Sequence, residues 1–175
     1  QRNAALKETG RWDPMPGGRA TLDPWADLLI EHGSRVALGR REMIESMAQP
    51  LRETYAEIAP GDAPLSVTYE SGFELRSGGG VEEAREQFRR RLLWLADRER
   101  ERGATIAGPH RDDFHLQIGD RAVRDYGSQG QKRSAALALR LIQLQWMANE
   151  TGEKPVLLVD DLGAELDRDR RGRLL

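Results

Sequence analysis

Tyr126-Gly127-Ser128-Gln129-Gly130-Gln131 is the stretch of this 175-residue sequence that decides its fold. A helix-favouring run, Gln131 to Ala148, follows it at once. The Ser128 hydroxyl and free backbone N–H groups are therefore expected at the positive end of a helix, an arrangement that suits a phosphate. Lys132 and Arg133 oppose the helix dipole there, which is reasonable if an anion docks beside them. An ordinary glycine turn with a serine cap is the alternative interpretation.

The second informative stretch lies beyond that helix, where Pro155 opens the apolar run Val156 to Val159 and Asp160-Asp161 ends it. Such a run is typical of a strand buried on both faces. Carboxylates at the carboxyl end of a parallel strand lie where open α/β sheets place their ligands, and oxygen ligands suit Mg²⁺. Asp160 is therefore a candidate metal ligand, and Asp161 a candidate for orienting an attacking water. Two solvated acids leaving the core are an equally good alternative.

Upstream of the first stretch, the sequence predicts a hairpin. Phe114 to Ile118 and Arg121 to Arg124 are the expected strands, and Gly119-Asp120 is the expected two-residue turn of type I′ or II′.

Two long amphipathic helices are predicted still earlier. The first begins at Pro24, after the N-cap Asp23, and runs to Ile58, although Gly33, Gly39 and Pro50 should weaken or kink it. The second spans Glu82 to Arg102, and a short strand, Leu65 to Tyr69, lies between them. The apolar stripes are expected at Trp25, Leu28, Leu29, Val36, Met43, Ile44, Met47, Leu51, Tyr55 and Ile58, and at Phe88, Leu92, Leu93, Leu95 and Ala96. Nearly balanced charges predict a solvated, ion-paired face on the second helix.

Composition excludes several classes of protein. The net charge is −2 with a pI near 6.0, so no global basic field indicates nucleic acid. Cysteine is absent, which excludes disulfides and thiolate metal sites and fits a reducing cytosol. No apolar run approaches the ~20 residues of a membrane span. The chain opens on Gln1 within a helix-like segment, so we expect a piece of a longer protein.

The order of these features resembles the signature motif, Walker B strand and D-loop of an ABC-type ATPase head, with Ala164-Glu165-Leu166-Asp167 as the D-loop. Within that superfamily, Gly108-Pro109-His110, the turn at 126–131 and Asp160-Asp161 look like the RecF family of bacterial recombinational-repair proteins. The resemblance implies an α/β fold, a partial P-loop NTPase with an antiparallel helical arm. Residues 1–103 would be the arm, with a short strand segment near 64–76, and residues 104–175 the C-terminal part of the head.

The resemblance also implies the site. Two heads would dimerise with ATP between them, and Ser128, Gly130 and Gln131 would contact the γ-phosphate bound to the opposite protomer. Asp160 would serve Mg²⁺, and Asp161 would take the place of the hydrolytic acid. Because Asp is one methylene shorter than the usual Glu, slow hydrolysis is expected. Asp167 would belong to the D-loop, where Ala164 departs from the common Ser.

The implied function is ATP-dependent DNA repair, associated with DNA replication and the SOS response. The homodimer would act in the cytoplasm on gapped or junction DNA with single-stranded parts, and would cooperate with RecO and RecR in loading RecA, with no membrane partner. The locally basic residues Arg121, Arg124, Lys132 and Arg133 are candidate DNA contacts, and a role toward ATP or as ordinary surface residues is the alternative. His110 and Arg111 are candidate site or interface residues, a satisfied turn histidine being the alternative.

Two other functions stay open from the residues: another SMC-like chromosome-maintenance ATPase, and a non-hydrolysing interaction scaffold with an ABC-type head. No Gly-x-x-x-x-Gly-Lys-Ser/Thr phosphate loop occurs in the sequence. We therefore expect weak ATPase activity only in a longer protein, and neither tight ATP binding nor hydrolysis by these 175 residues alone.

Overall fold

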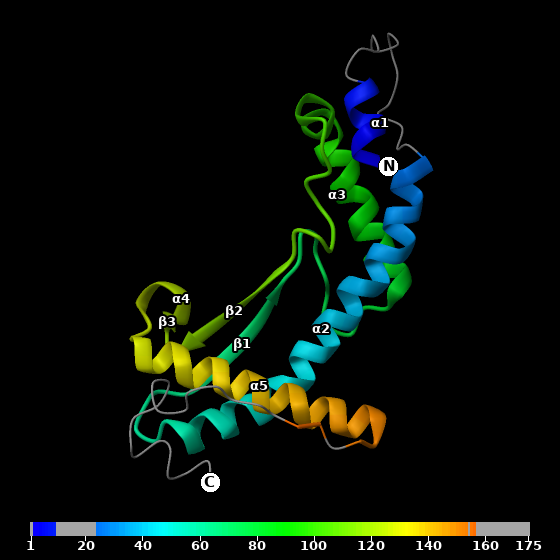
Figure 1. The fold of residues 1–175 in the computed structure, drawn as a ribbon. Helices are drawn as coiled ribbons and strands as arrows, with labels where there is room; N and C mark the ends of the chain where they lie inside the picture. Colours follow the sequence, from blue (N-terminus) through cyan, green and yellow to red (C-terminus); the bar gives the residue numbers. More distant parts are fainter. Residues whose placement is uncertain (1, 10–23, 154, 157–175) are drawn as a thin grey trace. The chain divides into compact units, whose positions relative to one another are not determined.

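The computed structural model describes residues 2–9, 24–153 and 155–156 (Figure 1). The elements in chain order are α1 (Arg2–Thr9), α2 (Pro24–Ile58), β1 (Leu65–Glu70), α3 (Val81–Arg102), β2 (Asp113–Ile118), β3 (Arg121–Ala122), α4 (Val123–Tyr126) and α5 (Gln129–Thr151). The chain forms two compact units, each built from two segments. Unit 1 comprises Gln1–Glu42 and Tyr69–Asp113, and unit 2 comprises Met43–Thr68 and Phe114–Leu175.

The two long helices and the strand between them agree with the sequence prediction. Helix α2 begins at Pro24 and ends at Ile58, and it continues through Gly33, Gly39 and Pro50. The predicted hairpin is only partly correct. Its turn is present, with Gly119 at a φ of 60°, but its second strand ends at Ala122. Val123 instead begins α4 and buries its side chain in the core of unit 2, so Val123 and Arg124 are helical.

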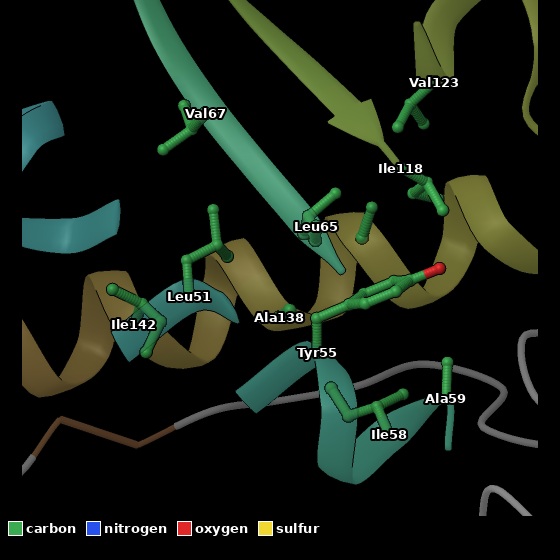
Figure 2. Packing of buried hydrophobic residues seen from close by; sticks show 11 residues of the cluster. Leu51, Tyr55, Ile58, Ala59, Leu65, Val67, Ile118, Val123, Ala138 and Ile142 are labelled. Atoms are coloured by element: carbon green, nitrogen blue, oxygen red, sulfur yellow. The ribbon is translucent and has the colours of Figure 1, made fainter. Parts of the chain in front are cut away.

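Unit 2 is organised around a three-stranded sheet in the order β1-β2-β3. Figure 1 shows the arrows of β1 and β2 running in opposite directions, and β3 pairs antiparallel with β2 through Gln117 and Ala122. Side chains from α2, β1, β2, α4 and α5 meet in one core (Figure 2). Its members are Leu51, Tyr55, Ile58, Ala59, Leu65, Val67, Ile118, Val123, Ala135, Ala138 and Ile142. This core fixes the start of α5, where the predicted signature turn lies.

Unit 1 has a separate core, centred on Phe73 and Phe88, whose rings stack with centroids 4.3 Å apart. Here the predicted stripe of α2 is wrong for Trp25, Leu28 and Val36, which are exposed, whereas Leu29 is partly buried against the core as predicted. The buried face is formed by Ala26, Ile30, Gly33, Ser34, Ala37 and Leu38. Mostly small residues lie on it, and they let neighbouring side chains approach the helix closely. Leu93 of α3, also predicted to be buried, is exposed as well.

Within unit 1, a buried polar network joins α1 to α3 and to the segment that follows it. Glu99 of α3 is 0% exposed and accepts from Arg2 at 2.7 Å and from the backbone N–H of Ile106 at 2.8 Å. Asn3 accepts the backbone N–H of Thr105, also at 2.8 Å. Because burying a carboxylate without hydrogen-bond partners is costly, the network fixes where α1 meets α3.

Among the helices of the described ranges, none combines the length and apolar character that crossing a bilayer requires. The compact units do not follow the expected division into an arm at 1–103 and a head part at 104–175, because α2 contributes to both of them. That division refers to the organisation of the family and stays a prediction.

Candidate functional site

The predicted signature turn forms the N-terminus of α5, and Ser128 is its N-cap. The Gln131 backbone N–H donates to Ser128 Oγ at 3.2 Å, and the Ser128 backbone N–H donates to Gln131 Oε1 at 3.0 Å. These reciprocal bonds are a capping box, which satisfies two N–H groups that a helix start leaves open. The serine cap foreseen as the simpler alternative is therefore present. The capping box still leaves exposed backbone of the turn, at Gln129 and Gly130, available to a ligand.

Gly127 sets the angle at which the chain enters α5. Its N–H donates to the Val123 carbonyl at 3.1 Å, and a Cβ added to it would lie 2.6 Å from that carbonyl oxygen. Its φ of −66° is ordinary, so the requirement for glycine is one of space. With no side chain at 127, the last turn of α4 lies directly against the residue that caps α5.

The turn keeps several hydrogen-bond donors for a ligand. Ser128, Gln129 and Gly130 are exposed, and the backbone N–H groups of the first helical turn have no carbonyl partner within the helix. The Ser128 oxygen accepts from Gln131, while its own proton remains available for donation. No acidic residue lies in the first turn of α5. Exposed donors at the positive end of a helix can bind a phosphate group.

The four basic residues predicted as DNA contacts all belong to unit 2. Arg121 lies on β3, Arg124 on α4, and Lys132 and Arg133 in the first turn of α5. Arg121, Arg124 and Arg133 are exposed, and Lys132 is half-buried. Arg121, Arg124 and Lys132 form no ion pair with another residue in the described ranges, so their charge is available to an anionic ligand.

The predicted catalytic and metal-binding residues cannot be placed in this site. Asp160, Asp161, Ala164 and Asp167 lie outside the described residues. Of the buried strand predicted from Val156 to Val159, only Val156 is described, and the prediction is wrong for it, because it is not in a strand and is 82% exposed. Within the described ranges, no group of three or more histidine, aspartate or glutamate side chains is arranged to hold a metal ion. The Mg²⁺ site therefore remains a prediction from the sequence.

His110 fits the simpler of its two interpretations, because its Nε2 lies 3.3 Å from the Thr105 carbonyl oxygen in the turn that follows α3. A groove of about 450 Å³ in unit 2 is lined by Glu45, Arg52 and Ser66 among others. None of the predicted site residues lines it.

Comparison with known proteins shows which proteins the chain is similar to. No protein-family model matches it. The DNA replication and repair protein RecF of Halothermothrix orenii is 38% identical over 179 residues, which cover 100% of this chain and 46% of the relative. The RecF proteins of Herpetosiphon aurantiacus and Halalkalibacterium halodurans are 38% and 37% identical, again over the whole chain.

The chain is homologous to the C-terminal part of RecF. It spans less than half of the length of these RecF relatives.

Solved structures agree with the sequence relatives. The structure described as the recombination mediator protein RecF-ATP in the RecFOR pathway has a TM-score of 0.84 and 33% identity, and the match covers 99% of this chain and 45% of that one. The RecF-ATPrS structure has a TM-score of 0.83 and 34% identity. The expected RecF fold is thus confirmed for the whole chain, as helices with a small antiparallel sheet. The P-loop part of that expectation remains a proposal.

Two features of the turn were missed in the sequence. The spacing Ser128-x-x-Gln131 is the pattern of a capping box and signals the reciprocal bonds seen here. The requirement at Gly127 has no such local signal, because it depends on where the Val123 carbonyl lies after α4 has formed.

Proposed function

We propose that the chain supplies the signature half of an ATP-dependent DNA-repair protein of the RecF type. The observation that carries this proposal is the exposed, capped turn at Ser128, found in a chain that is homologous to part of RecF. The relatives act in DNA replication and repair by name, and a solved relative holds ATP. The whole protein would bind ATP and DNA in recombinational repair.

The residues of the turn would act on ATP held by the opposite protomer of a dimer. Ser128 would donate its hydroxyl proton to a γ-phosphate oxygen. The Gln131 backbone N–H would meanwhile hold the Ser128 hydroxyl oxygen in place. The N–H groups of Gln129 and Gly130, at the positive helix end, would add donors to the same charge. The capping box supports this role because it fixes the turn before any ligand arrives, and so reduces the ordering cost of binding.

Asp160 and Asp161 would complete the site from the end of a strand proposed at 157–159. Both are hard oxygen donors, which fit Mg²⁺. A metal there would neutralise phosphate charge, Asp160 would hold it, and Asp161 would orient the attacking water. Asp167 would belong to the D-loop, which would communicate across the dimer interface. The arm at 1–103 and the head part at 104–175 are the organisation that this function implies.

DNA would be bound through phosphate contacts. Arg121, Arg124 and Lys132 are suited to this because they form no ion pair with another described residue, and Arg133 lies exposed beside Lys132. Gapped or junction DNA, the partners RecO and RecR, and delivery of RecA are parts of the same proposal. The dimer would form in the cytoplasm.

The test is ATP-dependent dimerisation of a protein in which this chain is preceded by the N-terminal half of a RecF relative. Light scattering with ATP and Mg²⁺ should show dimers. Ser128→Asp should abolish them, because aspartate caps a helix as well as serine does but places a negative charge against the phosphate. Gln145→Glu, the same charge change on an exposed site of α5, should leave the dimer intact. Dimers that survive Ser128→Asp would refute the role of the turn.

The scaffold alternative is separated by a second variant of the same protein. Asp161→Asn should slow ATP hydrolysis and prolong the ATP-bound dimer, because the water loses its orienting carboxylate. A non-hydrolysing scaffold would show no change in either property.

A further inference from the structure

We propose that Trp94 of α3, flanked by Arg91 and Arg98, is a binding site for single-stranded DNA on unit 1. We call these three residues the tryptophan patch. The proposal rests on the proposed function only for the choice of DNA as ligand. No predicted site residue belongs to the patch.

Trp94 is an unusual residue on its helix. It is 61% exposed, although α3 has a buried side that includes Phe88, Leu92 and Leu95. The guanidinium carbons of Arg91 and Arg98 lie 4.6 Å and 4.9 Å from the centroid of its ring. Because these arginines stand three residues before and four after Trp94, the three side chains form a row about 10 Å long on one helix face.

The charge of the patch is not neutralised within unit 1. Arg85, Arg89, Arg90 and Arg100 of the same helix each pair with a carboxylate. Arg91 and Arg98 form no ion pair with any described residue, and both guanidinium groups lie over the Trp94 ring. Asp97, beside Arg98, is held by Arg100 at 2.7 Å. The patch therefore presents two available positive charges on either side of an exposed aromatic ring.

This combination fits a single strand better than a duplex or a protein. Stacking needs a base whose face is uncovered, and a duplex covers both faces of its bases. The two guanidinium groups lie over the ring, so a base that stacks on Trp94 would displace one of them from the ring. The displaced guanidinium would then be within reach of the phosphates that flank the base. A protein interface would be expected to surround the ring with further apolar area, whereas Trp94 is surrounded mainly by charged residues.

The experiment measures binding of the full chain to a fluorescently labelled oligo-dT of about 20 nucleotides by anisotropy. Trp94→Ala should weaken binding about tenfold, because base–aromatic stacking is lost, whereas Trp94→Phe should keep most of the affinity. Since Trp94 is exposed, both variants should retain the circular dichroism of the parent chain.

Charge is tested with a matched pair of double variants on the same helix. Arg91→Gln with Arg98→Gln should weaken binding and lower the salt dependence by ~0.7 in slope for each lost phosphate contact. Arg89→Gln with Arg90→Gln removes the same charge from arginines that already have carboxylate partners, and should change affinity less than twofold.

The proposal is overturned if the chain does not bind oligo-dT, if Trp94→Ala binds as tightly as the parent chain, or if both double variants weaken binding equally. Unchanged binding by Trp94→Ala would point to a protein partner instead. Failure of the proposed function would show separately, as loss of ATP-dependent dimerisation, an assay that does not use the tryptophan patch.

Discussion

Tyr69 donates its hydroxyl proton to Asp112, and the same carboxylate accepts the backbone N–H of Gly72 at 2.8 Å. The two bonds join the end of β1 to the segment before β2 within unit 1. Burial first, and then the hydrogen bond and negative charge of Asp112, raise the pKa of Tyr69 above its ordinary value of 10.0. The neutral phenol is therefore the form that the fold favours.

A pH dependence follows from the direction of that shift. Because the pKa of Tyr69 is higher in the folded state, its contribution to stability is complete below about pH 10 and is lost progressively above it. Tyr69→Phe should lower the free energy of unfolding by about 1–3 kcal/mol at pH 8, and should then lose less stability than the parent chain between pH 8 and pH 10.5. Urea unfolding at the two pH values measures both effects.

Tyr126→Phe is the control for this prediction, since Tyr126 is 73% exposed. It should follow the parent chain at both pH values. An equal loss of stability in Tyr69→Phe and the parent between those values would contradict the assignment to Tyr69.

Among the elements, α2 contains two glycines that differ in their surroundings. A Cβ at Gly33 would lie 2.8 Å from Phe88 Cε1 and 3.2 Å from Pro109 Cδ. A Cβ at Gly39 would meet nothing within 4 Å. Gly33 thus lets Phe88 pack against the helix backbone, whereas Gly39 only lowers the intrinsic stability of the helix.

Alanine at these two positions should have opposite effects. Gly39→Ala should raise the free energy of unfolding by up to about 1 kcal/mol, the difference in helix propensity. Gly33→Ala gains the same propensity, but displacing Phe88 costs about 1–3 kcal/mol, so the variant should be less stable than the parent chain. Urea denaturation of the two variants measures the difference. Stabilisation by Gly33→Ala would show that the Phe88 ring can move at little cost.

At the scale of the whole molecule, the two separate cores should be distinguishable by hydrogen exchange. Phe88→Ala removes a ring from the core of unit 1, and Leu51→Ala removes a fully buried side chain from that of unit 2, changes that typically cost about 2–5 kcal/mol. Each variant should raise amide exchange more in its own unit, read peptide by peptide by mass spectrometry. Equal acceleration across both units would show that they unfold together.

The sequence is a good guide wherever a local signal controls the structure. Helix α2 begins at Pro24 and ends at Ile58 as predicted, and the Gly119-Asp120 turn forms where expected. The buried face of α2 in unit 1 could not be predicted from hydropathy. Gly33 and Ala37 lie on that face, and they fit there because they are small rather than because they are strongly apolar.

In the candidate sites too, some residues could be predicted from the sequence and others only from the structure. Ser128 and its glycines follow from the motif, and the homology to RecF supports that interpretation. Trp94 was not singled out in the sequence, because a tryptophan between charged residues predicts neither burial nor contact. Its role depends on Arg91 and Arg98 facing the ring rather than an acid, which only the folded helix shows.

The capping box also restricts how position 128 can change over evolutionary time. The side chain there accepts a hydrogen bond from Gln131, and the proposed nucleotide contact requires that it also have a proton to give. Serine and threonine hydroxyls do both, whereas aspartate preserves the helix start but has no proton to donate, and alanine does neither. A lineage that acquired aspartate at this position could therefore keep its fold after losing the nucleotide contact, and its sequence alone would record the loss.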